Sequence, residues 1–244
     1  MKLRAALWLT IGVWIAAAAM AHAQAPPSIP PTLPPDHTFA RSIAFIRGHL
    51  LTGDELVKQQ AWDAALPHFR FPIEEIYGVI REDLRVYKTP PFDGAIKTLV
   101  RTVGARNAKQ YLKALEKVQE ALAVADAELK TRQPNWPRFT LQVAIETLKA
   151  VPDEYQDAVV KDRIVRPIGY QTARGFMLQA NRMVESVAGD LDAKNADALR
   201  DLRESFAELK RAFAPVMAPK RPPLDAAAML ALISRIEVAA GKLM

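Results

Sequence analysis

The chain has 244 residues, no cysteine and a formal net charge of +6 at pH 7. The lack of cysteine excludes disulfides, thiolate metal sites, c-type haem attachment and thiol nucleophiles. Hydrophobic residues make up 50% of the chain, enough for a full buried core. Basic and acidic residues are interleaved, as in "KALEKVQE", which is typical of solvated helix faces and argues against nucleic-acid binding.

Residues 1–23 have the pattern of a secretory signal peptide. Lys2 and Arg4 supply a positive start, an uncharged apolar run covers 7–20, and Ala-His-Ala at 21–23 has the small-x-small pattern of a cleavage site. The apolar run is too short for a comfortable membrane span. We therefore expect cleavage after residue 23, a periplasmic location, and no transmembrane segment in the mature chain. A retained N-terminal anchor is the alternative.

Residues 24–36, "QAPPSIPPTLPPD", form a proline-rich linker. This composition favours an extended polyproline conformation without a core of its own. We expect a spacer, with a docking peptide as the alternative. Residues 37–244 are then predicted to form the helical domain.

Hydrophobic residues recur with helical spacing through most of this domain. The stripes predict helices at 38–59, 73–87, 89–104, 107–131, 136–151, 152–160, 168–191, 195–213 and 225–244. No credible set of residues alternates with the period of a strand. The predicted fold class is therefore all-α, an antiparallel bundle of roughly eight helices. One continuous core is preferred, and two stacked four-helix halves that divide near 131–137 are the alternative.

Three of these helices begin at a capping residue. Asn107 is a good N-cap, with Gln110 at the capping-box position, and Asn195 and Asp225 stand at the start of later helices. The helical pattern is interrupted at 162–167, where Pro167 disfavours helical angles in the residue before it. We expect a kinked helix with a short basic hinge at this point.

Histidine and glutamate residues in the first third of the chain are candidates for a metal site. Imidazole and carboxylate groups suit iron, zinc or copper. The segment "LPHFRFPIEEIYG" holds His68, Glu74 and Glu75, and its prolines predict a turn before the helix at 73–87. If the helix that contains His49 packs against that helix, we expect His49, His68 and one of the two glutamates to converge.

The predicted metal ligands are therefore His49, His68, Glu74 and Glu75, with the identity of the metal left open. The alternative is that the histidines are solvated or lie at the edge of the core. In that case the glutamates only satisfy the amino end of a helix.

We do not expect an enzyme. The chain has no G-x-S-x-G, no glycine-rich phosphate loop and no S-x-x-K. The H-x-x-E motif of imelysin-like periplasmic proteins is also absent.

Residues 154–176, "EYQDAVVKDRIVRPIGYQTARGF", carry a family resemblance. They resemble a stretch of the periplasmic helical domains that precede the membrane part of high-affinity iron permeases. The chain departs from that pattern at Arg163, where glycine is expected, and at Gly169, where glutamate is expected. The matching positions are Tyr155, Ala158, Val159, Ile164, Val165, Tyr170, Gln171 and Phe176.

The resemblance implies an exported helical binding or accessory protein in periplasmic iron handling. It implies iron or another transition metal as the ligand, and a membrane transporter as a partner in the cell envelope. The permease motif Arg-Glu-x-x-Glu has no counterpart here, so the chain looks like a stand-alone relative of the soluble part. The alternative is a structural or protein-interaction protein of the envelope with no metal or catalytic role.

Overall fold

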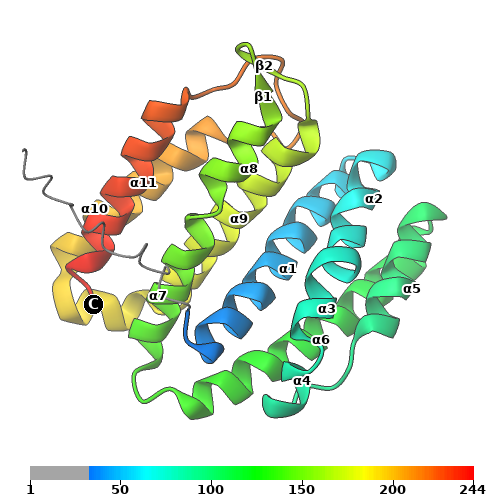
Figure 1. Cartoon of the computed structure of the whole chain (residues 1–244), viewed down its shortest axis with the longest axis horizontal. Coiled ribbons are helices and arrows are strands. Elements are labelled where there is room, and N and C mark those ends of the chain that lie inside the picture. The colour runs from blue at the N-terminus through cyan, green and yellow to red at the C-terminus, as the bar shows by residue number, and fades with distance from the viewer. Residues whose placement is uncertain (1–32) are drawn as a thin grey trace, which may run out of the picture. The chain divides into compact units, whose positions relative to one another are not determined.

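A computed structural model describes residues 33–244, whose helices are arranged in two layers (Figure 1). The predicted signal peptide and almost all of the predicted linker lie outside the described residues. The linker ends earlier than predicted, because α1 (Pro35–Lys58) already begins at Pro35. Proline suits the first turn of a helix, where its missing N–H has no role. The all-α fold class is confirmed.

The N-terminal layer contains the helices that precede residue 133. In chain order after α1 these are α2 (Trp62–Phe71), η1 (Pro72–Ile76), α3 (Tyr77–Ile80), α4 (Asp83–Val86), α5 (Asp93–Gly104) and α6 (Ala108–Arg132). Helix α2 packs against both α1 and α5, and α5 packs against α6. Their apolar faces share one hydrophobic cluster, which includes Phe39, Phe69 and Tyr111.

The C-terminal layer contains the remaining helices. These are α7 (Trp136–Leu148), α8 (Val151–Ala158), α9 (Pro167–Ser186), α10 (Ala188–Ala212) and α11 (Ala226–Gly241). Helices α7 and α8 follow one another along α9, and α10 packs with α11. Most of their buried side chains form a second hydrophobic cluster. The two clusters divide within α7, because Phe139 and Val143 belong to the first cluster and Leu141 and Leu148 belong to the second. Trp136 and Met183 pack against both clusters.

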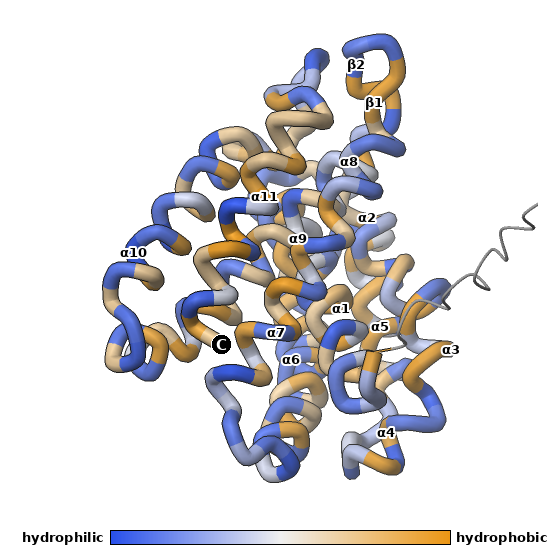
Figure 2. The backbone as a smooth tube through the Cα atoms, turned by 60° about the vertical axis from the view of Figure 1, so that its left-hand side comes forward, coloured by the Kyte–Doolittle hydropathy of each residue, from blue (hydrophilic) through white to orange (hydrophobic). Residues whose placement is uncertain are grey.

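Amphipathic helices account for this arrangement. Figure 2 shows α10 as hydrophilic along most of its length, with hydrophobic residues recurring along it. The recurring residues of its second part are all buried: Leu199, Leu202, Phe206 and Leu209. Helix α1 differs, because it is buried on more than one side, with α2 against one face and α9 against another.

The three predicted N-caps are confirmed. Asn107, Asn195 and Asp225 each accept a hydrogen bond from the backbone N–H three residues further on, at 3.1, 3.0 and 2.7 Å. Asn195 has φ −162° and ψ 91°, so it interrupts α10 and begins its second part. The cap therefore starts a helical segment inside a longer helical stretch.

The predicted break between two helices at 162–167 is confirmed, because α8 ends at Ala158 and α9 begins at Pro167, but the break is not a kink in one helix. The chain instead forms an antiparallel hairpin of β1 (Val159–Val160) and β2 (Arg163–Ile164) between α8 and α9. Lys161 and Asp162 have positive φ values of 47° and 57°, the pattern of a tight turn that joins two strands. The β-branched residues of this stretch favour strand over helix. The hairpin reverses the chain, so that α8 and α9 lie side by side.

The predicted turn before residue 73 is also wrong, because α2 continues directly into η1 (Figure 1). Pro67 lies inside α2, and His68 is in the last turn of that helix. The N–H of Tyr77 bonds to the carbonyl of Pro72, five residues earlier, which is the spacing of a π-helix. This wider turn accommodates Pro72, which cannot donate to the preceding turn, and helical structure then resumes.

Two glycines set the distance between the layers. A Cβ atom on Gly175 of α9 would lie 2.4 Å from the carbonyl oxygen of Gly48 and 2.6 Å from the hydroxyl of Thr52, both on α1. A Cβ atom on Gly48 would lie 2.7 Å from the ring of Phe176. The backbones of α1 and α9 therefore approach as closely as the absence of side chains allows.

Candidate functional site

Six polar side chains lie beside this contact, between the two layers. We call them the polar seam: His49, Thr52 and Glu55 from α1, His68 from α2, and Gln171 and Arg174 from α9. Steps of three residues place each set on one face of its helix. All are buried except the half-buried Glu55.

The two histidines are in direct contact. Their Nδ1 atoms are 3.3 Å apart, and the Nε2 atom of His68 is 3.2 Å from the side-chain oxygen of Gln171. The ring of His49 also stacks on Phe71 and meets Phe176 edge-on. Both imidazoles are therefore enclosed by neighbouring side chains.

The hydrogen bonds assign a tautomer to each ring. The amide nitrogen of Gln171 donates to the carbonyl of Val216 at 3.2 Å, so its oxygen is left to accept from His68. His68 then carries its proton on Nε2, and its Nδ1 accepts from the Nδ1–H of His49. The chain of donors runs in one direction, from His49 through His68 and Gln171 to a backbone carbonyl.

Burial keeps both rings uncharged. Loss of solvation, and to a smaller degree the neighbouring His68, lower the pKa of His49 to about 3. Loss of solvation also lowers the pKa of His68 to about 4, although the hydrogen bond to Gln171 opposes this shift. Near neutral pH the pair is a neutral hydrogen-bonded unit.

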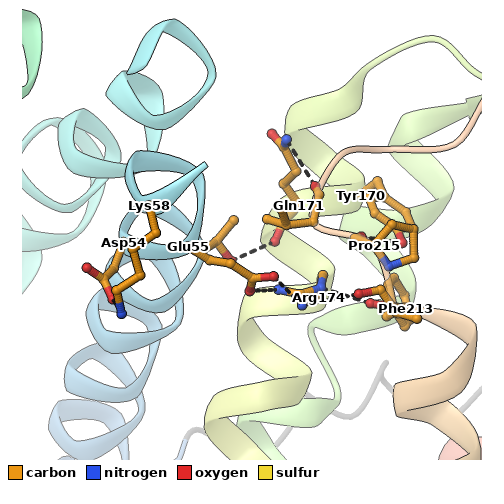
Figure 3. A network of polar contacts seen from close by, with 11 residues as sticks. Asp54, Glu55, Lys58, Tyr170, Gln171, Arg174, Phe213 and Pro215 are labelled. Carbon is orange, nitrogen blue, oxygen red and sulfur yellow. Dashed lines mark hydrogen bonds and ion pairs between the residues drawn. The ribbon is translucent and has the colours of Figure 1, made fainter. Parts of the chain in front are cut away.

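Helix α9 also holds the loop between α10 and α11, as Figure 3 shows. The Nε of Arg174 donates to the carbonyl of Phe213 at 2.8 Å, and the hydroxyl of Tyr170 donates to the carbonyl of Pro215 at 3.0 Å. With the Gln171 bond to Val216, adjacent turns of α9 donate to a single run of loop carbonyls. These bonds satisfy backbone groups that would otherwise be buried without partners.

A bidentate ion pair joins the layers. The guanidinium of Arg174 contacts both carboxylate oxygens of Glu55, at 2.6 and 3.0 Å, as Figure 3 shows. The side chain of Arg174 is 8% exposed and that of Glu55 is 35% exposed. The hydroxyl of Thr52 adds a bond to the carbonyl of Gln171 at 3.1 Å. The polar seam thus fixes the position of α1 on α9.

The structure brings together two of the four predicted metal ligands. His49 and His68 are in contact, whereas Glu74 and Glu75 are exposed on η1. Seven residues of regular α-helix would return Glu75 to the face of His68, but the π-turn rotates it away. Within residues 33–244, no three or more His, Asp or Glu side chains are arranged to hold a metal ion. The predicted set of four ligands is therefore not assembled.

The chemistry of the histidine pair also differs from that of a metal centre. A metal ion at the facing Nδ1 atoms would have to displace the proton between them. The carboxylate of the seam, Glu55, is already paired with Arg174 and so does not balance the charge of a metal. These residues fit a structural pair better than a metal site. Metal ligation by His49 and His68 stays a prediction for titration to test.

Sequence reasoning missed most of the polar seam. Thr52, Glu55 and Arg174 received no role, and Gln171 appeared only as a matching position of the family pattern. A signal was present at Arg174, which lies three or four residues from Tyr170 and Met177 on the buried stripe of α9. A charge inside an apolar stripe indicates a buried partner.

The comparison with known families gives one finding. A family model, described as the iron permease-associated 4-helix bundle domain, matches residues 130–244. The match starts in the last turn of α6 and covers the whole C-terminal layer. It confirms the resemblance seen at 154–176. No curated protein and no solved structure matches the chain.

None of the helices formed by residues 33–244 combines the length and the apolar character needed to cross a membrane. The matched region contributes Gln171 and Arg174 to the polar seam, while the other four residues of the seam precede it.

Proposed function

We propose that this chain is an exported accessory protein of an iron uptake system, which works beside a membrane permease and has no catalytic role. The match of residues 130–244 to the iron permease-associated 4-helix bundle domain carries this proposal. The matched residues make up a complete layer of packed helices with its own hydrophobic cluster. The likeness therefore concerns a structural unit rather than a short motif.

The sequence before the helices supports the location. Residues 1–23 have the order of charges, apolar residues and small residues that export requires. The proline-rich residues that follow suit a spacer between the helical layers and the point of attachment or cleavage. A periplasmic protein with such a spacer is able to reach a permease in the membrane.

The polar seam supports an accessory role rather than catalysis. Its histidines are neutral and use their facing nitrogens on each other, and its one carboxylate is paired with Arg174. These groups are occupied in holding the two layers together. A partner would therefore meet the outer faces of the layers, in one fixed arrangement.

Iron uptake by cells tests the proposal. We expect a strain of the host without this gene to take up radioactive iron more slowly when iron is scarce, and the full-length gene to restore the rate. A version without residues 2–23 serves as the control and should not restore it, because the protein would stay inside the cell. Unchanged uptake in the deletion strain would contradict the proposal.

Metal titration then shows whether the protein itself carries iron. Calorimetry with iron, copper and zinc is compared between the unaltered protein and the His49→Gln, His68→Gln double variant. Binding heat that disappears in the variant would assign the metal to the histidine pair. If neither protein gives binding heat and the deletion strain still takes up iron more slowly, the partner protein rather than this chain binds the iron. Absence of heat with normal uptake would favour a structural envelope protein.

A further inference from the structure

Helix α11 is apolar on its outer face as well as on its inner one. It packs with α10 at one side of the C-terminal layer (Figure 1). The inner face lies in the hydrophobic cluster of that layer through buried residues such as Leu232 and Ile236. Steps of three and four residues place a second, uncharged set together on the outer face. Its members are all exposed: Ala227, Leu230, Ala231, Ser234, Val238 and Gly241.

The other long surface helices present charges on their outer faces. Helix α6 exposes Lys113 and Glu116, and α10 exposes Arg203. On α11, by contrast, Leu230 is 49% exposed and Val238 is 65% exposed. These two side chains therefore add little to the core of their own chain. A helix that is apolar all round is usually a buried helix, so the outer face of α11 indicates an interface.

This face has a hollow along one edge. The hollow has a volume of about 360 Å³ and lies between α10 and α11. Ser234 and Val238 of the face line it, together with Arg235 and Lys242 at its edge and Asp201 of α10. A side chain from a facing helix is able to enter such a hollow, as a knob enters a hole.

The two edges of the face carry opposite charges. Arg235 and Lys242 lie on the edge beside α10, and both are more than half exposed in their pairs with Glu208 and Asp201. Arg235 bonds Glu208 through one terminal nitrogen and keeps its other donors. Glu237 lies on the opposite edge, because helical residues advance by about 100° each. It is the one acidic residue of α11 and forms no ion pair with any other residue in 33–244.

These edges are complementary to each other. When two parallel helices are related by a two-fold axis, each edge of one meets the opposite edge of the other. Two copies of α11 would therefore place Glu237 of each over the hollow of the other, beside Arg235 and Lys242. Ser234 and Val238, near the middle of the face, would meet their own counterparts.

The face suits a second helix better than a lipid surface. Helices that lie on membranes commonly insert Trp or Phe, and this face has no aromatic residue. Glu237 would also be repelled by anionic lipids. We infer that α11 is the interface through which two copies of this chain associate, with their α11 helices parallel about a two-fold axis. The inference does not depend on the proposed role in iron uptake.

Sedimentation equilibrium of the purified protein tests the inference. We expect a dimer at about 50 µM that dissociates on dilution below about 1 µM. A protein that stays monomeric at about 200 µM would overturn the inference. So would a monomer that sediments with vesicles of phosphatidylglycerol and phosphatidylethanolamine, which would assign the face to a membrane.

Charges placed on the face make the test specific. We expect Leu230→Glu with Val238→Glu to weaken association at least tenfold, about the effect of burying charges at an interface, without lowering the melting temperature of the monomer. Val79→Glu is the control, at a side chain of α3 that is 68% exposed, and should leave association unchanged. Equal association of the α11 variant and the unaltered protein would overturn the inference.

The edge contact has its own variant. Glu237→Gln keeps the size of the side chain and removes the charge, so we expect about tenfold weaker association. Glu116→Gln, at an exposed glutamate of α6, is the matched control and should have no effect. An unchanged dissociation constant in Glu237→Gln would overturn the proposed pairing of the edges.

Cross-linking tests the orientation of the two helices. The chain has no cysteine, so a single introduced thiol reports only on its own surroundings. Ser234→Cys and Val238→Cys should each give a disulfide-linked dimer on mild oxidation, because both positions lie near the axis. Val79→Cys should stay monomeric. Cross-linking through Ser234→Cys without Val238→Cys would indicate antiparallel helices and overturn the parallel arrangement.

Discussion

Gly175 determines how closely the two layers approach. Its missing side chain leaves room for the carbonyl of Gly48 and the hydroxyl of Thr52, which a Cβ atom would meet at 2.4 and 2.6 Å. The first of these is a backbone atom and cannot rotate away. A side chain at this position would therefore push α1 and α9 apart and stretch the bonds that join them, from Thr52 to Gln171 and from Glu55 to Arg174.

We expect Gly175→Ala to lower the free energy of unfolding by about 3 kcal/mol, as overpacking of a tight contact does. Urea unfolding measures the change. Gly78→Ala is the control, because a Cβ atom there would have no neighbour within 4 Å. That exposed helical position should gain stability, by up to about 1 kcal/mol. Equal effects of the two substitutions would show that the α1–α9 contact tolerates expansion.

Gly169 explains one departure from the family pattern. A Cβ atom there would lie 2.7 Å from the carbonyl oxygen of Glu154 and 3.1 Å from the side chain of Ala158. The close packing of α8 on α9 thus requires glycine in this chain, where the pattern led us to expect glutamate. The difference reflects local packing between two helices that the hairpin brings together.

The histidine pair predicts a dependence of stability on pH. The folded-state pKa values of His49 and His68, about 3 and about 4, lie below the ordinary value of 6.5. Between these values and 6.5 the unfolded chain binds more protons than the folded one, so stability falls as the pH falls. Each histidine contributes up to about 1.4 kcal/mol per pH unit within its range. Above about pH 6.5 the contribution is fully present.

We expect the His49→Gln, His68→Gln variant to lose less stability than the unaltered protein between about pH 7 and about pH 5. Glutamine keeps a donor and an acceptor at each position but does not titrate. Urea unfolding at both pH values gives the two slopes. His37→Gln, at a half-exposed histidine, is the control and should keep most of the original slope. An unchanged slope in the double variant would show that the buried pair is not what titrates.

At the scale of elements, the ion pair between α1 and α9 predicts that removing one partner costs more stability than removing both. Glu55→Gln leaves the buried guanidinium of Arg174 without a countercharge, and we expect a loss of about 3 kcal/mol in the free energy of unfolding. Adding Arg174→Gln should recover part of that loss, because the unpaired charge is then gone while an amide donor remains for the carbonyl of Phe213. Urea unfolding of the single and double variants measures both effects.

The control for this prediction is Glu185→Gln. Its carboxylate pairs with Arg203 at 2.6 Å on the surface, with both side chains more than 40% exposed. Such a pair contributes at most about 1 kcal/mol. If Glu55→Gln costs no more than Glu185→Gln, the Arg174 site is better solvated than its burial indicates.

Substitutions in the turn of the hairpin are predicted to stabilise the protein. Lys161 and Asp162 hold positive φ angles, which asparagine and glycine adopt more easily. We expect Lys161→Asn with Asp162→Gly to raise the free energy of unfolding by about 1 kcal/mol. A shift in melting temperature measures this gain. Asp162→Val should have the opposite effect, since a β-branched residue is strained at such angles.

The helices and their caps were largely predictable from the sequence, whereas the details that shape the site were not. Periodicity and the caps at Asn107, Asn195 and Asp225 depend on residues close together in the chain. The hairpin was missed because its strands are only two residues long, too short for a pattern of alternation. The π-turn at Pro72 was missed because it depends on how a proline is accommodated within a continuing helix. His49 and His68 were brought together as expected, but their partners come from α9, distant in sequence.

At the scale of the whole molecule, the matched region should depend on the rest of the chain. Residues 130–244 produced alone would expose the face of α9 that α1 covers, including Gln171, Arg174 and Phe176. We expect this fragment to be less stable than the full chain and to self-associate. Co-production with residues 33–129 should give a stable 1:1 complex of the two fragments that associates no further than the full chain does. Size-exclusion chromatography and thermal melts measure both effects, and a stable monomeric fragment would contradict the expectation.

The crossing of α1 and α9 also affects the order in which the protein folds. The seam joins Thr52 to Gln171 and Glu55 to Arg174, pairs that are 119 residues apart. Helix α1 therefore has no α9 to pack against until most of the chain has been synthesised. Contacts between such distant residues slow folding and leave apolar surface open in the meantime. The newly made protein would thus need a chaperone most while its N-terminal half waits for its C-terminal half.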